Sequence, residues 1–480
     1  MATWLRDLLA ALLVVGIVWS AAVAYWRDAA SMPSPLDLLL VMLGLPLLLL
    51  TGLWFGRKLF QAAPGAAAPG AAESSASAVA PSSAAAPALA ILASSLRMPH
   101  GESPAELLAA LERGNARATL DPELTGDDGY PIMSVRAAAA DDADARGQVA
   151  AWIDSHGHAG QARDDGVRND GVRDDGVRDD GIRDDGVRDE HLRALLLGSG
   201  AAAELGALAA DRFLPYGQDG QDGQDGQDGP SLRLALLLPS AWSAETRRVA
   251  ARYLRQAVAD NGWPEEKIML QLVDDAGAVL AGPAKGAPVT LLLACASHVG
   301  EHTVNAWSAD LTLFSAAHQQ GMIPGEGAAG LLLAAAPDPA RPHAYVQVSG
   351  ASALRERSAD SERRPDGSLL AGLAARALEG AALPAYALGA VVADTGHRTG
   401  RLMELMGLVR DTVPHLDAGS DVLSTGAASG SCADAGFLAA LALAAQQADA
   451  LQAPVLCVAN EDPYRRLAMV VRPPHSAISS

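Results

Sequence analysis

Two long apolar segments open the chain, and shorter apolar runs with regular spacing follow much later. Leu8–Trp26 carries no charged residue, and Leu38–Phe55 is a second apolar run that ends before Arg57 and Lys58. As a helix of roughly 28 Å, the first run is long enough to cross a bilayer. A cleaved signal peptide is the alternative, but the run is long for one and a second span follows at once. We therefore predict a two-helix membrane anchor over residues 1–60, with spans at 8–26 and 38–55.

The charges that flank these spans predict their orientation. Arg6 precedes the first span and Arg57 and Lys58 follow the second, whereas the short link between them holds Arg27 and two aspartates. Positive residues favour the cytoplasmic side. We therefore expect both ends of the anchor on the cytoplasmic face of a bacterial inner membrane, with the remainder of the chain in the cytoplasm.

Residues 61–96 are rich in Ala, Pro and Ser, which is typical of a flexible linker. Residues 97–230 form a mixed region in which Ser103–Glu112 has the start signals of a helix and Pro131–Ala137 has the pattern of a strand. Two repeats interrupt this region, V/I-R-D-D-G over Arg163–Asp189 and QDG over Gln218–Gly229. Their dense charge and glycine predict solvated, disordered loops. Calcium binding is the alternative, but the nine-residue spacing of calcium repeats is absent.

Residues 231–475 alternate between strand-like and helix-like patterns, which predicts a layered α/β core with some parallel strand pairing. The expected strands are Leu232–Leu238, Ile268–Val273, Val289–Ala294, Gly330–Ala335, His343–Ser349, Leu388–Asp394, Val455–Asn460 and Ala468–Val471. The expected helices are Ala244–Asn261, Ser368–Gly380, Arg401–Thr412 and Gly436–Gln447.

Composition narrows the classes of partner. The formal net charge is −20, and this argues against nucleic acid, because phosphate binding needs clustered cations. It is compatible with a protein partner that carries positive charge. The three cysteines, Cys295, Cys432 and Cys457, lie in or beside apolar stretches. We expect buried free thiols and no disulfides.

Four segments follow one another in a recognisable order: Gly321–Leu333, His343–Ser349, Leu388–Gly396 and Leu423–Phe437. Together they resemble the β-ketoacyl synthase branch of the thiolase superfamily. The first is the GMIPGEGAAGLLL run, which resembles the segment that enters the second half of those enzymes. A strand that ends before Gly350, a strand that would deliver an active-site histidine, and a Ser/Gly-rich loop before a buried helix follow in the family's order. The closing hairpin is similar too. The resemblance implies a layered αβαβα core of two related halves.

The residues that perform the family's chemistry are missing from the matching positions. The resemblance places the nucleophilic cysteine within Ala244–Ala281, where no cysteine occurs. Asp394 takes the place of one active-site histidine and Ser431 that of the other, while Asn460 begins a segment that replaces the closing glycine-rich loop. An ionised Asp394 would repel a developing oxyanion. These three residues mark a site that we expect to be catalytically silent.

Other chemistries have weaker support. Asp394, His397, Ser429 and Ser431 are the residue types of a hydrolase triad, but no nucleophile elbow surrounds either serine. The histidine pairs at 156/158 and 298/302 lack a third ligand at metal spacing. No phosphate-binding loop or dinucleotide fingerprint occurs. We therefore expect no metal and no cofactor.

Two main functions remain open. The first is a membrane-tethered adapter that binds a protein partner, and its organisation is similar to that of the accessory adapters of lipase effectors in type VI secretion. The second is an acyl transferase or condensing enzyme that acts on acyl thioesters, with Cys295 as the available thiol. A purely structural membrane protein is a third possibility. The family resemblance also implies a homodimer.

Overall fold

The computed structural model describes residues 89–157, 187–214, 230–282, 288–335, 346–361 and 366–473. The two expected spans at 8–26 and 38–55, most of the linker and nearly all of both repeats lie outside these residues. Within the described chain, the apolar runs form a ten-stranded mixed sheet in the order β10-β9-β11-β12-β8-β1-β7-β6-β4-β5.

The sheet consists of two halves with the same connectivity. Each half has five strands, counted here in chain order. The second strand lies between the third and the fourth and is parallel to both. The fifth strand is antiparallel to the fourth, and the first is antiparallel to the fifth. A short antiparallel pairing between β1 and β8 joins the halves. The first half contains β1 (Leu89–Arg97), β4 (Leu232–Leu237), β5 (Ile268–Leu272), β6 (Val289–Ser297) and β7 (Glu326–Ala335). The second contains β8 (Val346–Leu354), β9 (Ala390–Ala393), β10 (Val422–Ser424), β11 (Val455–Ala459) and β12 (Arg465–Arg472).

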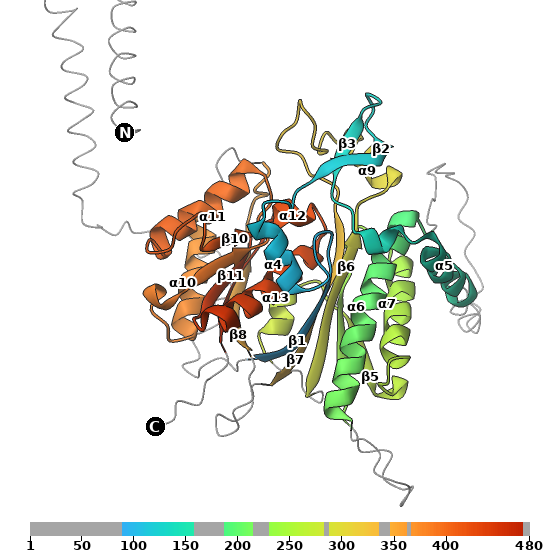
Figure 1. Ribbon diagram of the computed structural model, residues 1–480, viewed down its shortest axis with the longest axis horizontal. Helices are drawn as coiled ribbons and strands as arrows, with labels where there is room; N and C mark the ends of the chain where they lie inside the picture. Colours follow the sequence, from blue (N-terminus) through green and yellow to red (C-terminus); the bar gives the residue numbers. More distant parts are fainter. Residues whose placement is uncertain are drawn as a thin grey trace, which may run out of the picture. The chain divides into compact units, whose positions relative to one another are not determined.

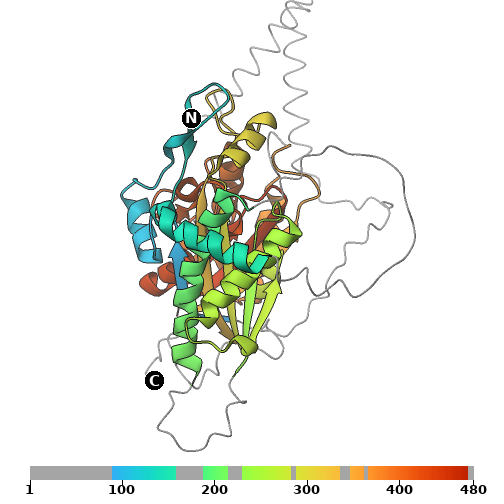
Figure 2. The same cartoon turned by 90° about the vertical axis from the view of Figure 1, so that its right-hand side faces the viewer.

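Helices cover both outer faces of the sheet and fill the space between its halves (Figure 1). Over the first half lie α6 (Asp189–Phe213) and α7 (Ala244–Ala259), which run side by side (Figure 2). Over the second half lie α10 (Ser368–Gly380) and α11 (Thr399–Thr412). Between the halves lies α13 (Asp434–Leu451), which is buried on nearly every side, as its continuous Ala/Leu sequence requires.

Alternation along the strands confirms this layering. In β11, Cys457 faces the apolar cluster around α13, whereas Leu456 and Val458 face the cluster under α10 and α11. In β6, Leu292 faces the α13 side and Cys295 faces α6 and α7. Successive side chains of a strand point to opposite faces, so each half has apolar packing on both sides. The result is a five-layer α/β arrangement of two related halves, as the family resemblance implies.

The two halves differ in their central helices. The second half supplies the 18-residue α13, whereas the corresponding element of the first half is α8 (Ala276–Leu280), with only 5 residues. The helix α4 (Pro104–Glu112) packs against α13 and contributes Leu107 to the central core. Its N-cap is Ser103, whose side chain accepts a hydrogen bond from the Glu106 amide, as expected.

Smaller elements lie around the first half. A hairpin of β2 (Thr119–Thr125) and β3 (Pro131–Ser134) precedes α5 (Ala143–Gly157), and α9 (Glu301–Ala309) follows β6. Short 3₁₀ turns occupy Ala138–Asp141, Glu265–Lys267 and Ala385–Ala387, and a four-residue helix, α12, occupies Gly426–Ser429.

Three sequence predictions need correction. The expected linker over 61–96 includes β1, an inner strand of the sheet, and the first half therefore starts at Leu89 and not at residue 231. The helix α6 was not predicted, and it begins at Asp189, the last residue of the VRDDG repeat. Gly350 is not in a loop, because β8 continues to Leu354; a side chain at Gly350 would collide with Met469 of β12. Glycine there allows the two strands to pair closely.

Among the described helices, only α6 is long and apolar enough to span a membrane by length and composition. It packs instead on β6 and β7 and contributes Leu195, Leu197 and Leu205 to the core of the first half.

Candidate functional site

A cleft of about 750 Å³ opens where the two halves meet. It lies at the carboxyl ends of β4, β5, β9 and β11, the edge at which parallel α/β sheets commonly bind ligands. Asp275 enters from the start of α8, Asp434 from the start of α13, and Asp394 and Glu461 follow β9 and β11. Each side chain follows a buried strand or begins a helix, so the sheet fixes where the polar groups converge.

The stretch Gly321–Leu333 positions one wall of this cleft. The Ser431 amide donates a hydrogen bond to the Ile323 carbonyl at 2.8 Å, and the Ser431 carbonyl lies 2.6 Å from Nδ1 of His298. Gly325 packs directly on the turn beside Ser429: a Cβ at Gly325 would lie 2.0 Å from the Ser429 carbonyl oxygen. Only glycine allows this approach, and it brings a loop of the first half against a loop of the second.

The carboxylate of the same stretch is a structural group. Glu326 is fully buried and receives hydrogen bonds from Nη2 of Arg193 at 2.6 Å and from Nε of Arg193 at 2.8 Å. It also accepts bonds from the Ser297 hydroxyl and the Ala137 amide. One carboxylate therefore ties β7 to α6, to β6 and to the segment after β3.

Asp394 lies nine-tenths buried in the cleft, with an exposed fraction of 8%. Its Oδ1 accepts hydrogen bonds from the amides of Asn460 at 2.8 Å and Glu461 at 3.2 Å. Burial raises the pKa of Asp394 to about 7, against the lowering effect of these amide bonds. Near neutral pH the group therefore exists in both protonation states, and the expected repulsion of an oxyanion applies only to its ionised form.

The other two predicted site residues have different places. Ser431 lines the cleft and is half-buried. Asn460 is fully buried and does not line the cleft. Its side-chain Nδ2 donates to the Arg401 carbonyl at 2.9 Å, and its Oδ1 accepts from the Thr395 hydroxyl at 2.6 Å. Asn460 thus holds the loop after β11 against α11 and positions the amide that binds Asp394.

The three cysteines are buried and free, as the sequence predicts. Cys295 lies in the outer layer under α6, where it packs against Gly198, and it does not line the cleft. Cys432 does line it, and sequence reasoning missed this residue although it directly follows Ser431. Burial raises the pKa of Cys432 to about 12, so its thiol is not ionised at neutral pH.

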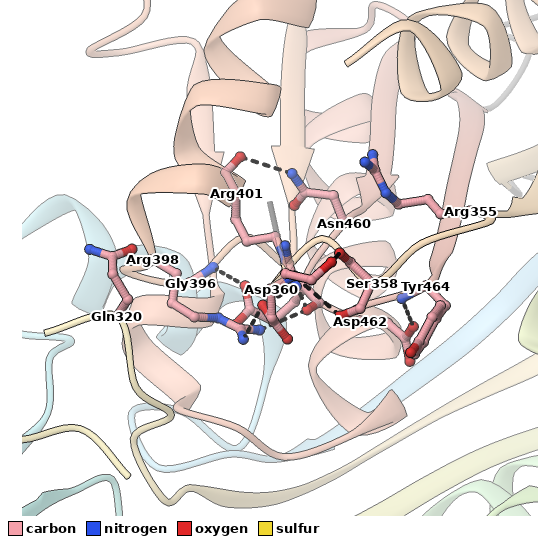
Figure 3. Close-up of polar contacts among 12 residues, drawn as sticks. Gln320, Arg355, Ser358, Asp360, Gly396, Arg398, Arg401, Asn460, Asp462 and Tyr464 are labelled. Atoms are coloured by element: carbon pink, nitrogen blue, oxygen red, sulfur yellow. Dashed lines mark hydrogen bonds and ion pairs between the residues drawn. The ribbon is translucent and has the colours of Figure 1, made fainter. Parts of the chain in front are cut away.

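A second group of polar residues, which the sequence did not predict as part of the site, lies along one side of the cleft (Figure 3). Asp360, on the loop after β8, pairs with Nη1 of Arg398 at 2.9 Å and with Nη2 of Arg401 at 2.7 Å. Arg398 also pairs with Glu461 at 2.8 Å. The backbone of the same loop is bonded to Pro463. The only sequence signal was the pair of arginines three residues apart at the start of a predicted helix.

The alternative sites do not assemble within the described residues. His397 does not line the cleft, and the Ser429 hydroxyl donates to the Thr425 carbonyl at 3.1 Å instead of to a histidine. The histidine, serine and Asp394 therefore form no triad. No described group of three His, Cys, Asp or Glu side chains has the arrangement of a metal site.

The protonation of Asp394 gives a testable pH dependence. Unfolded aspartate titrates near pH 4 and Asp394 in the folded chain near pH 7, so folding stability contributed by this group falls as pH rises from about 4 to about 7. We expect Asp394→Asn to raise the free energy of unfolding at pH 8 by up to about 4 kcal/mol, and to have little effect at pH 4. Urea denaturation at both pH values measures this.

The matched control is Asp411→Asn, at an exposed carboxyl on α11 that pairs only with Arg410. This variant should keep the fall in stability that Asp394 causes between pH 4 and pH 8. An Asp394→Asn protein whose stability changes equally at pH 4 and pH 8 would show that folding does not raise the pKa of Asp394.

Comparisons with known proteins identify solved structures of similar architecture. No protein-family model matches the sequence, and no curated protein matches it. Solved structures do match. The ishigamide ketosynthase/chain length factor is 18% identical, with a TM-score of 0.50 over 81% of this chain and 100% of its own. The module 1 ketosynthase of the bacillaene synthase from Bacillus amyloliquefaciens FZB42 is 12% identical, with a TM-score of 0.53 over 82% of this chain and 75% of its own.

A ketosynthase domain for oxazolomycin from Streptomyces albus JA3453 is similar at 13% identity, with a TM-score of 0.52 over 82% of this chain and 76% of its own. The chain therefore has a ketosynthase-like, thiolase-type fold. The fold extends over more of the chain than the segments that resemble the family in sequence, because β1, α4 and α6 belong to it.

Proposed function

We propose that this chain is a catalytically inactive, ketosynthase-like protein, tethered to the bacterial inner membrane, that binds a protein partner on the cytoplasmic side. One observation carries the proposal. The cleft holds one thiol, Cys432, whose pKa is raised to about 12, and no histidine among the described residues lines it. Thioester chemistry needs a thiolate, and loss of a carboxylate group needs donors for the negative charge that develops. We infer that the fold is kept here without the groups that would perform this chemistry.

The tether supports a role in recruitment. Two apolar spans and a flexible linker, both expected from the sequence, would hold the folded part near the membrane and leave it free to reach a partner. We further propose that the partner is a secreted lipase effector of a type VI system, because the organisation of anchor, linker and α/β portion is similar to that of such adapters.

Partner binding is tested with the full chain in uncharged detergent. A tagged preparation should recover one reproducible protein from extracts of the native host, and the two purified proteins should then form a stoichiometric complex. A tagged protein of the same anchor and linker fused to an unrelated domain is the control. Recovery of the same proteins by both baits, or of no protein that binds after purification, would contradict the adapter.

Membrane attachment and sidedness need a separate measurement. The chain should resist alkaline carbonate extraction, and its folded part should be protected from protease in intact spheroplasts and digested after lysis. Digestion in intact spheroplasts would place the folded part outside the cytoplasm.

The second candidate is a condensing enzyme or acyl transferase, which the fold also permits. The observation in its favour is that Cys432 lines the cleft beside the start of α13, since a helix N-terminus can activate a thiol. Incubation with radiolabelled acyl coenzyme A or acyl carrier protein should leave the protein unlabelled if our proposal holds. Labelling that persists in Cys295→Ala and disappears in Cys432→Ala would establish the enzyme instead.

We also propose a homodimer through β5, the strand at one end of the sheet. Its Met269 is 49% exposed and its Leu272 is 40% exposed, an apolar edge with unpaired backbone groups. Light scattering of the full chain should give twice the protein mass, and Met269→Lys should reduce it to one chain.

A further inference from the structure

We infer that the cleft binds a cationic group, a guanidinium or ammonium at the end of an apolar stem. This inference goes beyond the proposed adapter role, because it names the class of ligand for the cleft and would hold for an enzyme as well. Four features of the cleft carry it: the charge of its lining, the pairing of its arginines, the free oxygen of Asp394 and its apolar walls.

The lining of the cleft is strongly acidic. Two guanidinium groups, Arg398 and Arg465, face seven carboxyl groups: Asp274, Asp275, Asp360, Asp394, Asp434, Glu461 and Asp462. A concave surface lined by one sign of charge concentrates ligands of the opposite sign. This lining repels the phosphates of coenzyme A.

Both arginines of the lining are already engaged. Arg398 is held by Asp360 and Glu461, as described above. Arg465 donates to the Asp274 carbonyl at 2.7 Å and pairs with Asp434. An incoming anion would therefore compete with the carboxylates that already pair with both guanidinium groups. An incoming cation would not, because several carboxylates still have an unused oxygen.

The acidic groups extend from the surface to the buried end of the cleft. The side chain of Asp274 is 91% exposed, that of Glu461 is 24% exposed, and Asp394 is 8% exposed. This gradient can attract a cation at the mouth and hold it further in.

Asp394 would bind the charged end of the ligand. This contact is a separate argument from the acidic charge at the mouth of the cleft. Both of its amide bonds go to Oδ1, and no described group binds Oδ2. Oδ2 is not among the buried atoms that lack a partner and keeps some accessible surface, so a donor from a ligand can reach it. Because Asp394 lines the cleft, that donor would come from within it. A cationic donor would also favour the ionised carboxylate and form the stronger, charge-assisted bond.

The remaining walls define the stem of the ligand. Val273, Met322, Phe437 and Leu467 line the same cleft with apolar side chains. Arginine and lysine side chains combine an apolar stem with a charged end, as do small alkyl amines. The cation therefore comes either from a side chain of a protein or from a free polyamine, and the experiment separates these two sources.

Isothermal titration of the full chain in uncharged detergent tests the inference with three probes. These are the capped peptide Gly-Arg-Gly, the same peptide with uncharged citrulline in place of arginine, and spermidine. We expect saturable binding of at least one cation and at least tenfold weaker binding of the citrulline peptide, because the charge-assisted bond is lost. Tighter binding of the arginine peptide indicates a protein side chain, and tighter binding of spermidine indicates a free amine.

Variants locate the site. Asp394→Asn keeps the shape and the Oδ1 acceptor, and it should weaken binding of the cation about tenfold or more. Asp274→Asn, at an exposed residue whose change should not disturb folding, should weaken it about two- to threefold at 50 mM NaCl. Asp411→Asn, outside the cleft, should leave it unchanged.

Three results would overturn the inference: no saturable heat with either cation, equal binding of the arginine and citrulline peptides, or unchanged binding in both cleft variants. If Asp394→Asn fails to fold, the citrulline comparison and Asp274→Asn still decide it. Partner recovery does not depend on these titrations, so either proposal can fail alone.

Discussion

Replacing Arg193 by methionine should lower the free energy of unfolding by about 3–5 kcal/mol, because it leaves the Glu326 carboxylate buried without its partner. Glu326 is fully buried and Arg193 supplies two of its four hydrogen bonds. Methionine fills a similar volume, so the lost pairing dominates over any cavity. Equilibrium urea denaturation of the full chain, followed by tryptophan fluorescence, measures the loss.

Two further variants separate the charge effect from packing. The double variant Arg193→Met/Glu326→Gln should recover part of the lost stability, because the neutral amide needs no counter-charge. Arg410→Met, which removes an exposed arginine paired with its neighbour Asp411, should have little effect. If Arg193→Met is as stable as Arg410→Met, the buried pair does not hold the first half together.

Gly325→Ala should open the junction between the halves and lower stability by about 1–3 kcal/mol or more, the cost of overpacking. The new Cβ would lie 2.0 Å from the Ser429 carbonyl oxygen and 2.8 Å from Cα of Gly430, both backbone atoms, so one of the two loops must move. Since these loops form a wall of the cleft, binding of the cationic probe should weaken together with stability. Thermal denaturation and titration of the same preparation measure the two effects.

Gly407→Ala is the matched control for this substitution. Gly407 lies within α11, and a Cβ there would meet nothing within 4 Å. Alanine should therefore be neutral or stabilise the helix by up to about 1 kcal/mol. A Gly325→Ala protein that matches Gly407→Ala in stability and binding would show that the two loops do not meet as described.

The charges around the cleft bear on our proposal that this chain does not perform thioester chemistry. By the sequence resemblance, Asp394 stands where those enzymes carry an imidazole, and burial raises the pKa of Asp394 to about 7. The arginines Arg398 and Arg401 are both paired with Asp360. The same groups leave the cleft acidic, which suits a cationic ligand better than a phosphorylated thioester.

Local patterns in the sequence determined most of the regular elements. The run in β6 was recognisable as a buried strand because all nine residues are apolar or small, and α7 and α10 because apolar residues recur at helical spacing. The start of α4 followed from the Ser103 cap and the proline after it. The order of the motifs after Gly321 also determined the fold class, because each motif is read from residues that are close in sequence.

Only the tertiary structure decided what these elements do together. Residues Leu89–Arg97 look like the end of an Ala/Ser-rich linker, and they form a strand because β7 and β8, more than 200 residues away, supply its hydrogen-bond partners. The ionisation of Asp394, the place of Cys432 in the cleft and the pairing of Asp360 with Arg398 likewise depend on burial and on neighbours distant in sequence. Burial and long-range pairing are properties of the packed chain, and no local pattern of residues encodes them.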